Sequence, residues 1–186
     1  MSYGIPVDEI LVAKLETYRA KAKSAALKRA MELGIVTKME QLVFHEAFPG
    51  TDLSQPVGAG YTNEAYLTGA AVINTWTSVY DTAVIPQLGN RQIAVFYKIA
   101  DWTAIPACTA VRFRLGPTGA TTLGWFHIEQ FINVKLTPEV YLSEPIVYSP
   151  SEFLFIEFYP MAAVPAAGEQ LGFGCFIAEP TGQAIS

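Results

Sequence analysis

The spacing of hydrophobic residues changes once along the chain, close to residue 40. Before that point apolar side chains recur every three or four positions, which predicts an amphipathic α-helix. After it they recur every second position, in short runs separated by Gly and Pro, which predicts β-strands. The pattern divides the chain into an N-terminal helical arm, 1–40, and a β-sandwich domain, 41–186.

Strong helix formers dominate the arm. Neither Gly nor Pro occurs in 9–33, and Gly34 supplies a stop at the C-terminal end. One face of the predicted helix is apolar, and its members are Leu11, Leu15, Tyr18, Ala22, Ala26, Ala30 and Leu33. Because the middle of this stripe is alanine, it buries little area by itself and favours a close approach to another helix or a flat surface. We expect the stripe to bind a partner.

Basic residues are concentrated in the same arm, which holds seven of the twelve Lys and Arg residues. They are partly offset by Asp8, Glu9, Glu16 and Glu32, and they are spread around the helix instead of lining one stripe. The whole chain has a net charge of −5. The pattern therefore does not indicate a nucleic-acid-binding surface.

Eight strand-like segments follow the arm, with no helical pattern between them. Several alternate cleanly, as where Val111 and Phe113 point one way while Arg112 and Arg114 point the other. The predicted strands are 41–48, 71–80, 92–99, 108–115, 122–134, 144–148, 152–159 and 169–178. This series predicts a mainly β protein with an eight-stranded antiparallel β-sandwich, preceded by one long N-terminal α-helix. The varied loop lengths favour a jelly-roll-like form over an immunoglobulin-like one.

The composition is poor in charge and rich in aromatic residues. Charged residues make up 16% and hydrophobic residues 51%, with eleven Phe, nine Tyr and three Trp. Soluble domains are typically about 25% charged. We therefore expect partners to cover part of the apolar surface. No uninterrupted apolar run reaches about 18 residues, so we expect no membrane-spanning helix, and no leader peptide is expected at the N-terminus.

No catalytic, cofactor or metal motif stands out, so we do not expect an enzyme. His45 has no second His at metal-site spacing, and His127 with Glu129 would supply only part of a cupin-type metal site. Cys108 and Cys175 have no neighbouring His or cationic cluster that would stabilise a thiolate. They predict two buried free thiols or, alternatively, a single disulfide.

Two further possibilities stay open because they depend on positions in space. Glu129 and Glu157, both inside apolar strands, could form a carboxylate pair for glycoside hydrolysis, although such residues more often face solvent or an interface. Trp76, Trp102 and Trp125 could stack on sugars, although such residues more often anchor a core or an interface.

The chain resembles a known class of virion protein in architecture and composition. Its nearest local signature is segment 143–150, SEPIVYSP, which runs into the apolar segment 153–156, FLFI. Such a segment is similar to the late strands of viral β-sandwich proteins. An alanine-rich arm followed by an aromatic, Gly/Pro-looped sandwich resembles the head decoration (cement) proteins of tailed bacteriophages. It is also similar in style to jelly-roll coat proteins.

This resemblance implies a structural role on the surface of a virion. The protein would be made in the host cytoplasm, bind the major capsid protein on the outside of the shell as a homotrimer, and clamp neighbouring coat subunits. It implies no cofactor, nucleic acid, membrane or small-molecule substrate. The alternatives are a carbohydrate- or receptor-binding module of a phage fibre or baseplate and, third, a cupin-like or glycosidase-like enzyme.

Overall fold

The structure of the protein is a computed structural model that describes residues 4–6, 12–47, 60–62, 65–67, 71–81, 88–116, 121–127, 139–150, 152–165 and 168–182. Its helices are α1 (Val12–Glu32) and the short 3-10 helix η2 (Met39–Gln41). Its strands are β1 (Gly4–Pro6), β2 (Leu42–Glu46), β3 (Gly60–Thr62), β4 (Ala65–Leu67), β5 (Thr77–Asp81), β6 (Ile93–Asp101), β7 (Cys108–Leu115), β8 (Thr121–His127), β9 (Glu139–Tyr148), β10 (Leu154–Pro160) and β11 (Gln170–Pro180). The protein is mainly β with one long N-terminal helix, as the sequence predicted.

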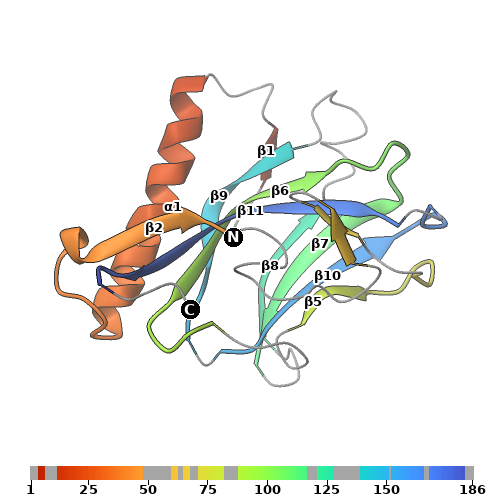
Figure 1. Cartoon of the computed structure of the whole chain (residues 1–186). Helices are drawn as coiled ribbons and strands as arrows, with labels where there is room; N and C mark the ends of the chain where they lie inside the picture. Colours follow the sequence, from red (N-terminus) through yellow and green to blue (C-terminus); the bar gives the residue numbers. More distant parts are fainter. Residues whose placement is uncertain are drawn as a thin grey trace.

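The strands form two antiparallel sheets that pack face to face (Figure 1). The larger sheet has the order β1-β9-β6-β11-β4-β3. The long strand β11 has β6 on one side, while β4 pairs with 170–172 and β2 with 176–180. The smaller sheet has the order β5-β10-β7-β8. This arrangement confirms the predicted jelly-roll-like sandwich.

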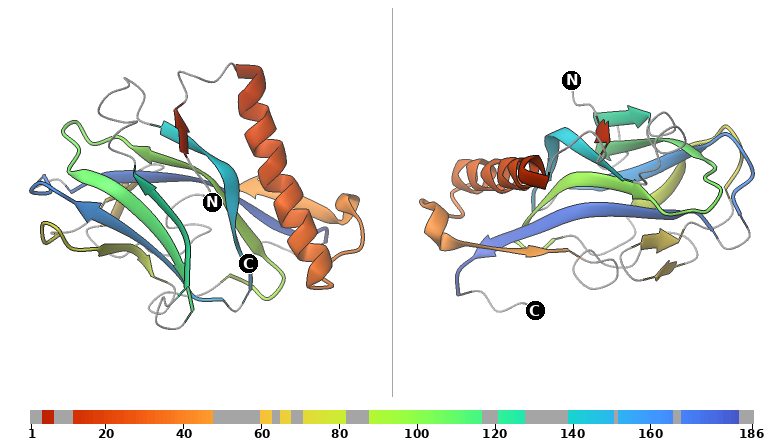
Figure 2. Two further views of the ribbon diagram at one scale, coloured as in Figure 1. Left: turned by 180° about the vertical axis from the view of Figure 1, so that it is seen from behind. Right: turned by 90° about the horizontal axis from the view of Figure 1, so that it is seen from above.

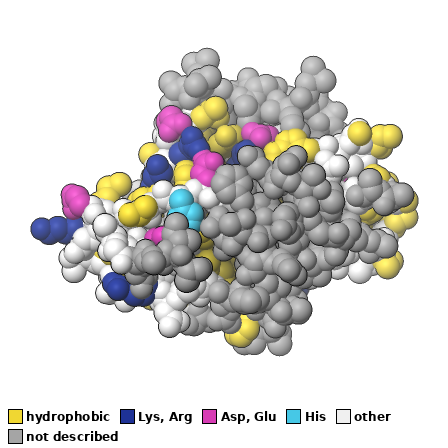
Figure 3. Space-filling model, viewed as in Figure 1, with side chains coloured by type: hydrophobic (Ala, Val, Ile, Leu, Met, Phe, Trp, Pro, Cys, Tyr) yellow, Lys and Arg dark blue, Asp and Glu magenta, His cyan; other side chains and the backbone are white. Residues whose placement is uncertain are grey.

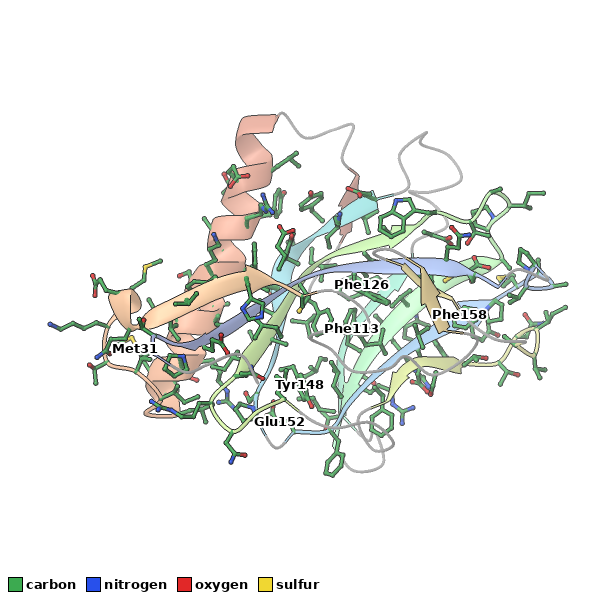
Figure 4. The ribbon with its side chains drawn as sticks, in the orientation of Figure 1. Met31, Phe113, Phe126, Tyr148, Glu152 and Phe158 are labelled. Atoms are coloured by element: carbon green, nitrogen blue, oxygen red, sulfur yellow. The ribbon has the colours of Figure 1, made fainter. Side chains whose placement is uncertain are left out.

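Large side chains from both sheets fill the space between them. Phe96 and Phe113 have ring centroids 5.4 Å apart, and Phe113 meets Phe126 edge to face at 6.0 Å. Phe113, Phe126 and Phe158 project into the interior (Figure 4). Ring pairs of this kind stabilise a core by about 0.5–1.5 kcal/mol each, in addition to the burial of their area. The predicted alternation in β7 is confirmed, because Phe113 is buried and its neighbour Arg112 is partly exposed.

Each of the eight predicted strands has a counterpart, with differences at the ends. The prediction 71–80 was wrong in its first half, because Thr75 N–H donates to the Val72 carbonyl in a turn and Asn74 has a φ of 60°. β5 therefore starts only at Thr77. The predicted strand 122–134 is confirmed as far as His127, and its remainder lies outside the described residues. The short strands β1, β3 and β4 were not predicted.

Helix α1 lies across the outer face of the seven-stranded sheet, over β6, β9 and β11 (Figure 2). Ala22, Ala26 and Ala30 face the sheet and have no exposed surface. They share a hydrophobic cluster with Val95 and Phe176 of the sheet. Small side chains let the helix axis approach the sheet closely, so the alanine stripe explains where the helix packs. In the described part of the chain, no helix has the length and apolar character needed to cross a membrane.

Gly34 ends the helix, as the sequence predicted. Its φ of 68° lies in the left-handed region, where glycine has no steric penalty. Ile35 N–H donates to the Ala30 carbonyl at 2.9 Å, and Gly34 N–H donates to the Met31 carbonyl at 3.0 Å. These two bonds form a Schellman motif, which satisfies carbonyl groups that the last helical turn leaves unpaired.

Candidate binding surfaces

The helical stripe expected to bind a partner lies against the protein's own sheet. Besides the three buried alanines, Leu15 is partly buried, and Tyr18 packs on Tyr141 with ring centroids 5.7 Å apart. Leu33 stays 43% exposed at the C-terminal end of the stripe, and Leu11 lies outside the described residues. A partner could reach the alanines of this stripe only if the helix left the sheet.

Two cations of the helix also attach it to the sandwich. Arg19 pairs with Glu46 of β2. Arg29 Nε donates to Ser149 Oγ at 2.7 Å, and its Nη2 lies 3.4 Å from Glu152 Oε1. In Figure 4 Glu152 lies at the lower edge of the sandwich, close to the labelled Tyr148. The solvent-facing side of α1 carries the exposed residues Lys21, Lys28 and Glu32.

Three loops form an apolar end of the sandwich, on the right in Figure 1. They are 71–76, 102–107 and 160–165, and none of these residues is charged. Four side chains of this end, Val72, Ile73, Ile105 and Met161, are between 45% and 80% exposed. Figure 3 shows hydrophobic side chains gathered along this edge of the molecule. We use the name apolar end for these four residues and their loops.

Backbone hydrogen bonds join the three loops to one another. Asn74 N–H donates to the Pro160 carbonyl at 2.8 Å. Met161 N–H donates to the Ala107 carbonyl at 3.0 Å. The exposed aliphatic side chains thus lie on loops that are hydrogen-bonded to one another. Binding a partner through them would therefore require little additional ordering of the chain.

A pair of buried carboxyl groups lies at the base of the apolar end. Asp101 and Glu169 are both almost fully buried. Glu169 Oε1 accepts hydrogen bonds from the N–H groups of Ala107 and Cys108, each at 2.9 Å. Asp101 Oδ1 accepts one from Thr103 N–H at 3.0 Å. These contacts fix both ends of the loop that carries the exposed Ile105.

The environment of Asp101 favours its neutral form. Burial, then the negative charge of Glu169, and then a hydrogen bond with that side chain raise the pKa of Asp101 to about 8. The hydrogen bonds from Thr103 act in the opposite direction but are weaker. At neutral pH the pair therefore carries one proton between two carboxyl groups, an arrangement that avoids two adjacent buried charges.

Both cysteines are free and buried, which confirms the first of the two predictions made for them. Burial, together with the charges of Asp101 and Glu169, raises the pKa of the Cys108 thiol well above its ordinary value. A thiol held in its neutral form is a poor nucleophile. The site around Cys108 thus does not favour thiolate chemistry.

Aromatic side chains gather on the outward face of the four-stranded sheet. Trp76 contacts Trp125 edge to face at 5.5 Å and Tyr159 at 5.2 Å, measured between ring centroids. His127 stacks on Trp125 at 5.6 Å with an interplanar angle of 26°. We call these four residues the aromatic platform. Trp125 is 54% exposed, so the platform is open to solvent.

Ionic side chains continue this face beside the platform. The guanidinium carbon of Arg112 lies 4.1 Å from the ring centroid of Trp76. Arg112 Nε donates to Glu157 Oε2 at 2.6 Å, and Arg114 Nη1 donates to the same oxygen at 3.0 Å. Glu157, one of the two carboxylates considered for glycoside hydrolysis, is therefore bound by two arginines. The other, Glu129, lies outside the described residues. Glu157 is arranged as an ion-pair partner and not as a proton donor.

Strand register, which the sequence pattern could not provide, creates this face. In the strand register Arg112 lies opposite Glu157 of β10 on one side and opposite Trp125 of β8 on the other. The three side chains therefore form a row across neighbouring strands. The structure brings Trp76 and Trp125 together but places Trp102 elsewhere, beside Gly172 of the larger sheet. Of the three tryptophans considered for sugar stacking, two therefore share one surface.

The remaining candidates for chemistry are dispersed. His45 Nδ1 lies 4.0 Å from Glu179 Oε1, and no three His, Cys, Asp or Glu side chains among the described residues are grouped as a metal site. A cavity of about 40 Å³ lies between Glu46, Tyr97 and Trp102. Ligand-binding pockets usually have volumes of about 300–1,000 Å³. This cavity has room for a water molecule but not for an organic substrate.

The chain was compared with protein-family models, with curated proteins and with solved structures, and none of them matches it.

Proposed function

We propose that the protein is a structural virion protein that binds the outside of a capsid shell and stabilises it by clamping neighbouring coat subunits, without catalysing a reaction. The observation that carries this proposal is the apolar end. Three uncharged loops there present Val72, Ile73, Ile105 and Met161 to solvent. Exposed aliphatic side chains gathered in one place are typical of surfaces that bind other proteins.

The free energy available from this surface suits multivalent attachment. Burying one aliphatic side chain completely contributes about 1.5–3 kcal/mol. Four such side chains, each between 45% and 80% exposed, can supply a modest affinity per copy after the cost of association is subtracted. When several copies are joined, as in a homotrimer on a shell, weak individual contacts add up to a high overall avidity. The partner in this proposal is the major capsid protein, and self-association supplies the multivalency.

The apolar end replaces the helical arm as the proposed contact with the coat. The alanine stripe of α1 is buried on the protein's own sheet, and the exposed side of the helix is mostly polar, with Met31 near its C-terminal end as the large apolar exception. An interface core is usually depleted of charged residues, which describes the apolar end and not the solvent-facing side of α1.

Co-sedimentation with capsid shells from the same source tests the proposal. Ile105→Ser combined with Met161→Ser should reduce the bound fraction strongly, about tenfold or more in affinity, because two aliphatic contacts are lost. Val43→Ser is the matched control, since Val43 is also exposed but lies on β2. Equal binding of the double variant and the control would contradict the proposal. Light scattering of the free protein would show a trimer if self-association precedes attachment.

A second candidate function is a carbohydrate- or receptor-binding module of a phage fibre or baseplate. The aromatic platform favours it, because Trp76 and Trp125 lie together on an outward sheet face beside Arg112. The surface for this function adjoins the apolar end at Trp76, which lies in the loop 71–76, but its exposed ring, Trp125, comes from β8 and not from those loops. The two functions can therefore be tested separately in the same protein.

A further inference from the structure

We propose that the outward face of the four-stranded sheet binds an acidic glycan, with a sugar ring stacked on Trp125 and its acidic group held by Arg112 and Arg114. This inference rests on the second candidate function and adds the class of ligand and the residues that recognise it. It does not depend on attachment to a shell.

The aromatic platform supplies a surface on which a sugar ring can pack. More than half of the surface of Trp125 is open, while His127 stacks on the indole and Trp76 meets it edge to face. These neighbours fix the orientation of the Trp125 ring before a ligand arrives. A large side chain held in its binding orientation loses little conformational entropy on binding. The apolar C–H face of a pyranose ring is flat and fits such an indole.

Charge on this face selects an acidic ligand. Among its described side chains, two guanidinium groups accompany one carboxylate, that of Glu157. The described side chains of this face therefore sum to a positive charge, on a chain whose net charge is −5. Both arginine side chains keep about a fifth of their surface exposed, 20% for Arg112 and 23% for Arg114. Guanidinium groups bind carboxylate and sulfate groups in a bidentate manner.

The geometry puts the stacking group and the cationic groups within reach of one ligand. Trp125 and Arg112 are direct partners across β8 and β7, and paired residues on antiparallel strands have Cβ atoms roughly 4.5–5.5 Å apart. On the same two strands, Arg114 pairs with the exposed Thr122, whose hydroxyl can bond to a sugar hydroxyl. Stacking and ionic contacts thus lie within the dimensions of a mono- or disaccharide.

This face differs chemically from the apolar end that it adjoins. The apolar end is aliphatic and uncharged, which fits a protein partner. The face of the four-stranded sheet combines the aromatic platform with arginines and a hydroxyl, a set that can satisfy both the apolar face and the polar edges of a sugar. The chemistry therefore favours a glycan over a second protein surface.

A printed panel of sialylated, uronate-containing and sulfated glycans, each with its neutral counterpart, tests the inference with the full-length protein. For uronates the counterpart is the methyl ester of the same oligosaccharide. We expect binding to acidic members and about tenfold weaker binding to the neutral ones. Trp125→Ala should weaken binding about tenfold or more, whereas Trp125→Tyr should retain most of it because an aromatic face is kept.

Arg114→Gln tests the ionic half of the site. Arg112 still pairs with Glu157 in this variant, so the buried carboxylate is not left alone. We expect the preference for acidic over neutral glycans to disappear while folding is retained. Ile105→Ser at the apolar end is the control and should bind glycans as the wild type does.

Three results would overturn the inference: no acidic glycan binds, neutral counterparts bind equally well, or Trp125→Ala binds like the wild type. If Trp125→Ala instead abolishes co-sedimentation with shells while no glycan binds, Trp125 belongs to a protein interface. Failure of shell attachment alone, with glycan binding intact, would contradict only the proposed capsid role.

Discussion

The carboxyl groups of Asp101 and Glu169 meet in the interior beneath the apolar end, and they accept hydrogen bonds from backbone N–H groups at the two ends of the loop that carries Ile105. Asp101 is the last residue of β6 and Glu169 directly precedes β11, so their contact joins neighbouring strands of the larger sheet at one end. A buried pair of this kind makes stability depend on pH, because only one of the two groups can be ionised at low cost.

The contribution of Asp101 to the free energy of unfolding should fall as the pH rises from about 4 to about 8. In the unfolded chain Asp101 loses its proton near its ordinary pKa of 3.8, whereas in the folded protein it keeps the proton up to about pH 8. The folded state therefore binds more protons in this window, and raising the pH favours the unfolded state. One such group gives a slope of at most about 1.4 kcal/mol per pH unit. Urea unfolding across this pH range measures it.

Asp101→Asn is the matched variant for that experiment. Asn keeps the shape of the side chain and the acceptor for Thr103 N–H, but it does not titrate. We expect a flatter pH profile and a gain in stability at pH 8 relative to the wild type. An unchanged slope would assign the pH dependence to other groups.

Enlarging the alanine stripe should loosen helix α1. Ala26→Leu forces a larger side chain between the helix and the sheet, where Ala26 has no exposed surface. We expect a loss of about 1–3 kcal/mol in the free energy of unfolding. Ala20→Leu, on the exposed side of the same helix, is the control, since Ala and Leu have similar helix propensities. Equal stability of the two variants would show that the helix is not held by this contact.

Gly172 provides the space that Trp102 occupies. A Cβ atom at this position would overlap the indole ring, so Gly172→Ala should displace Trp102 and lower stability by about 1–3 kcal/mol. Tryptophan fluorescence would report the displacement as a shift of the emission maximum. Adding Trp102→Ala to the glycine variant should relieve the overlap. A double variant that loses the sum of both single effects would contradict this explanation.

Arg29 should stabilise the packing of the C-terminal half of α1 on the sandwich. Arg29→Met removes the hydrogen bonds to Ser149 and Glu152, with an expected loss of about 1 kcal/mol because the site is partly exposed. Lys28→Met, on the exposed side, should change stability by less than about 0.5 kcal/mol. Hydrogen exchange would show faster exchange of the α1 amides in the Arg29 variant alone. Equal protection in both variants would remove Arg29 from this role.

The fold could be predicted from the sequence where the signal is local. The Ala22–Ala26–Ala30 spacing and the stop at Gly34 give the helix, and the alternation around Phe113 gives a strand with one buried side. The surface that covers the alanine stripe could not be found in this way. It is made by strands β6, β9 and β11, which lie far away in the sequence, and only tertiary packing brings them together.

The candidate surfaces were less accessible to prediction for the same reason. Trp76, Trp125 and Tyr159 come from three different parts of the chain, and their contact depends on which residues face each other across strands. The apolar residues Ile105 and Met161 lie between strands and belong to no periodic pattern. Their exposure follows from loop geometry, which hydrophobic spacing does not describe.

The position of β11 determines the order in which the fold can be completed. This strand follows every other described element in the sequence, yet it lies inside the larger sheet, where it pairs with β6 on one side and with β2 and β4 on the other. While the ribosome is still translating residues 170–180, those strands lack their shared neighbour. Helix α1, which rests on the same sheet, then has no finished surface beneath it. A chain cut short before β11 would therefore lose the attachment of β2 and β4 to the larger sheet together with its C-terminal strand.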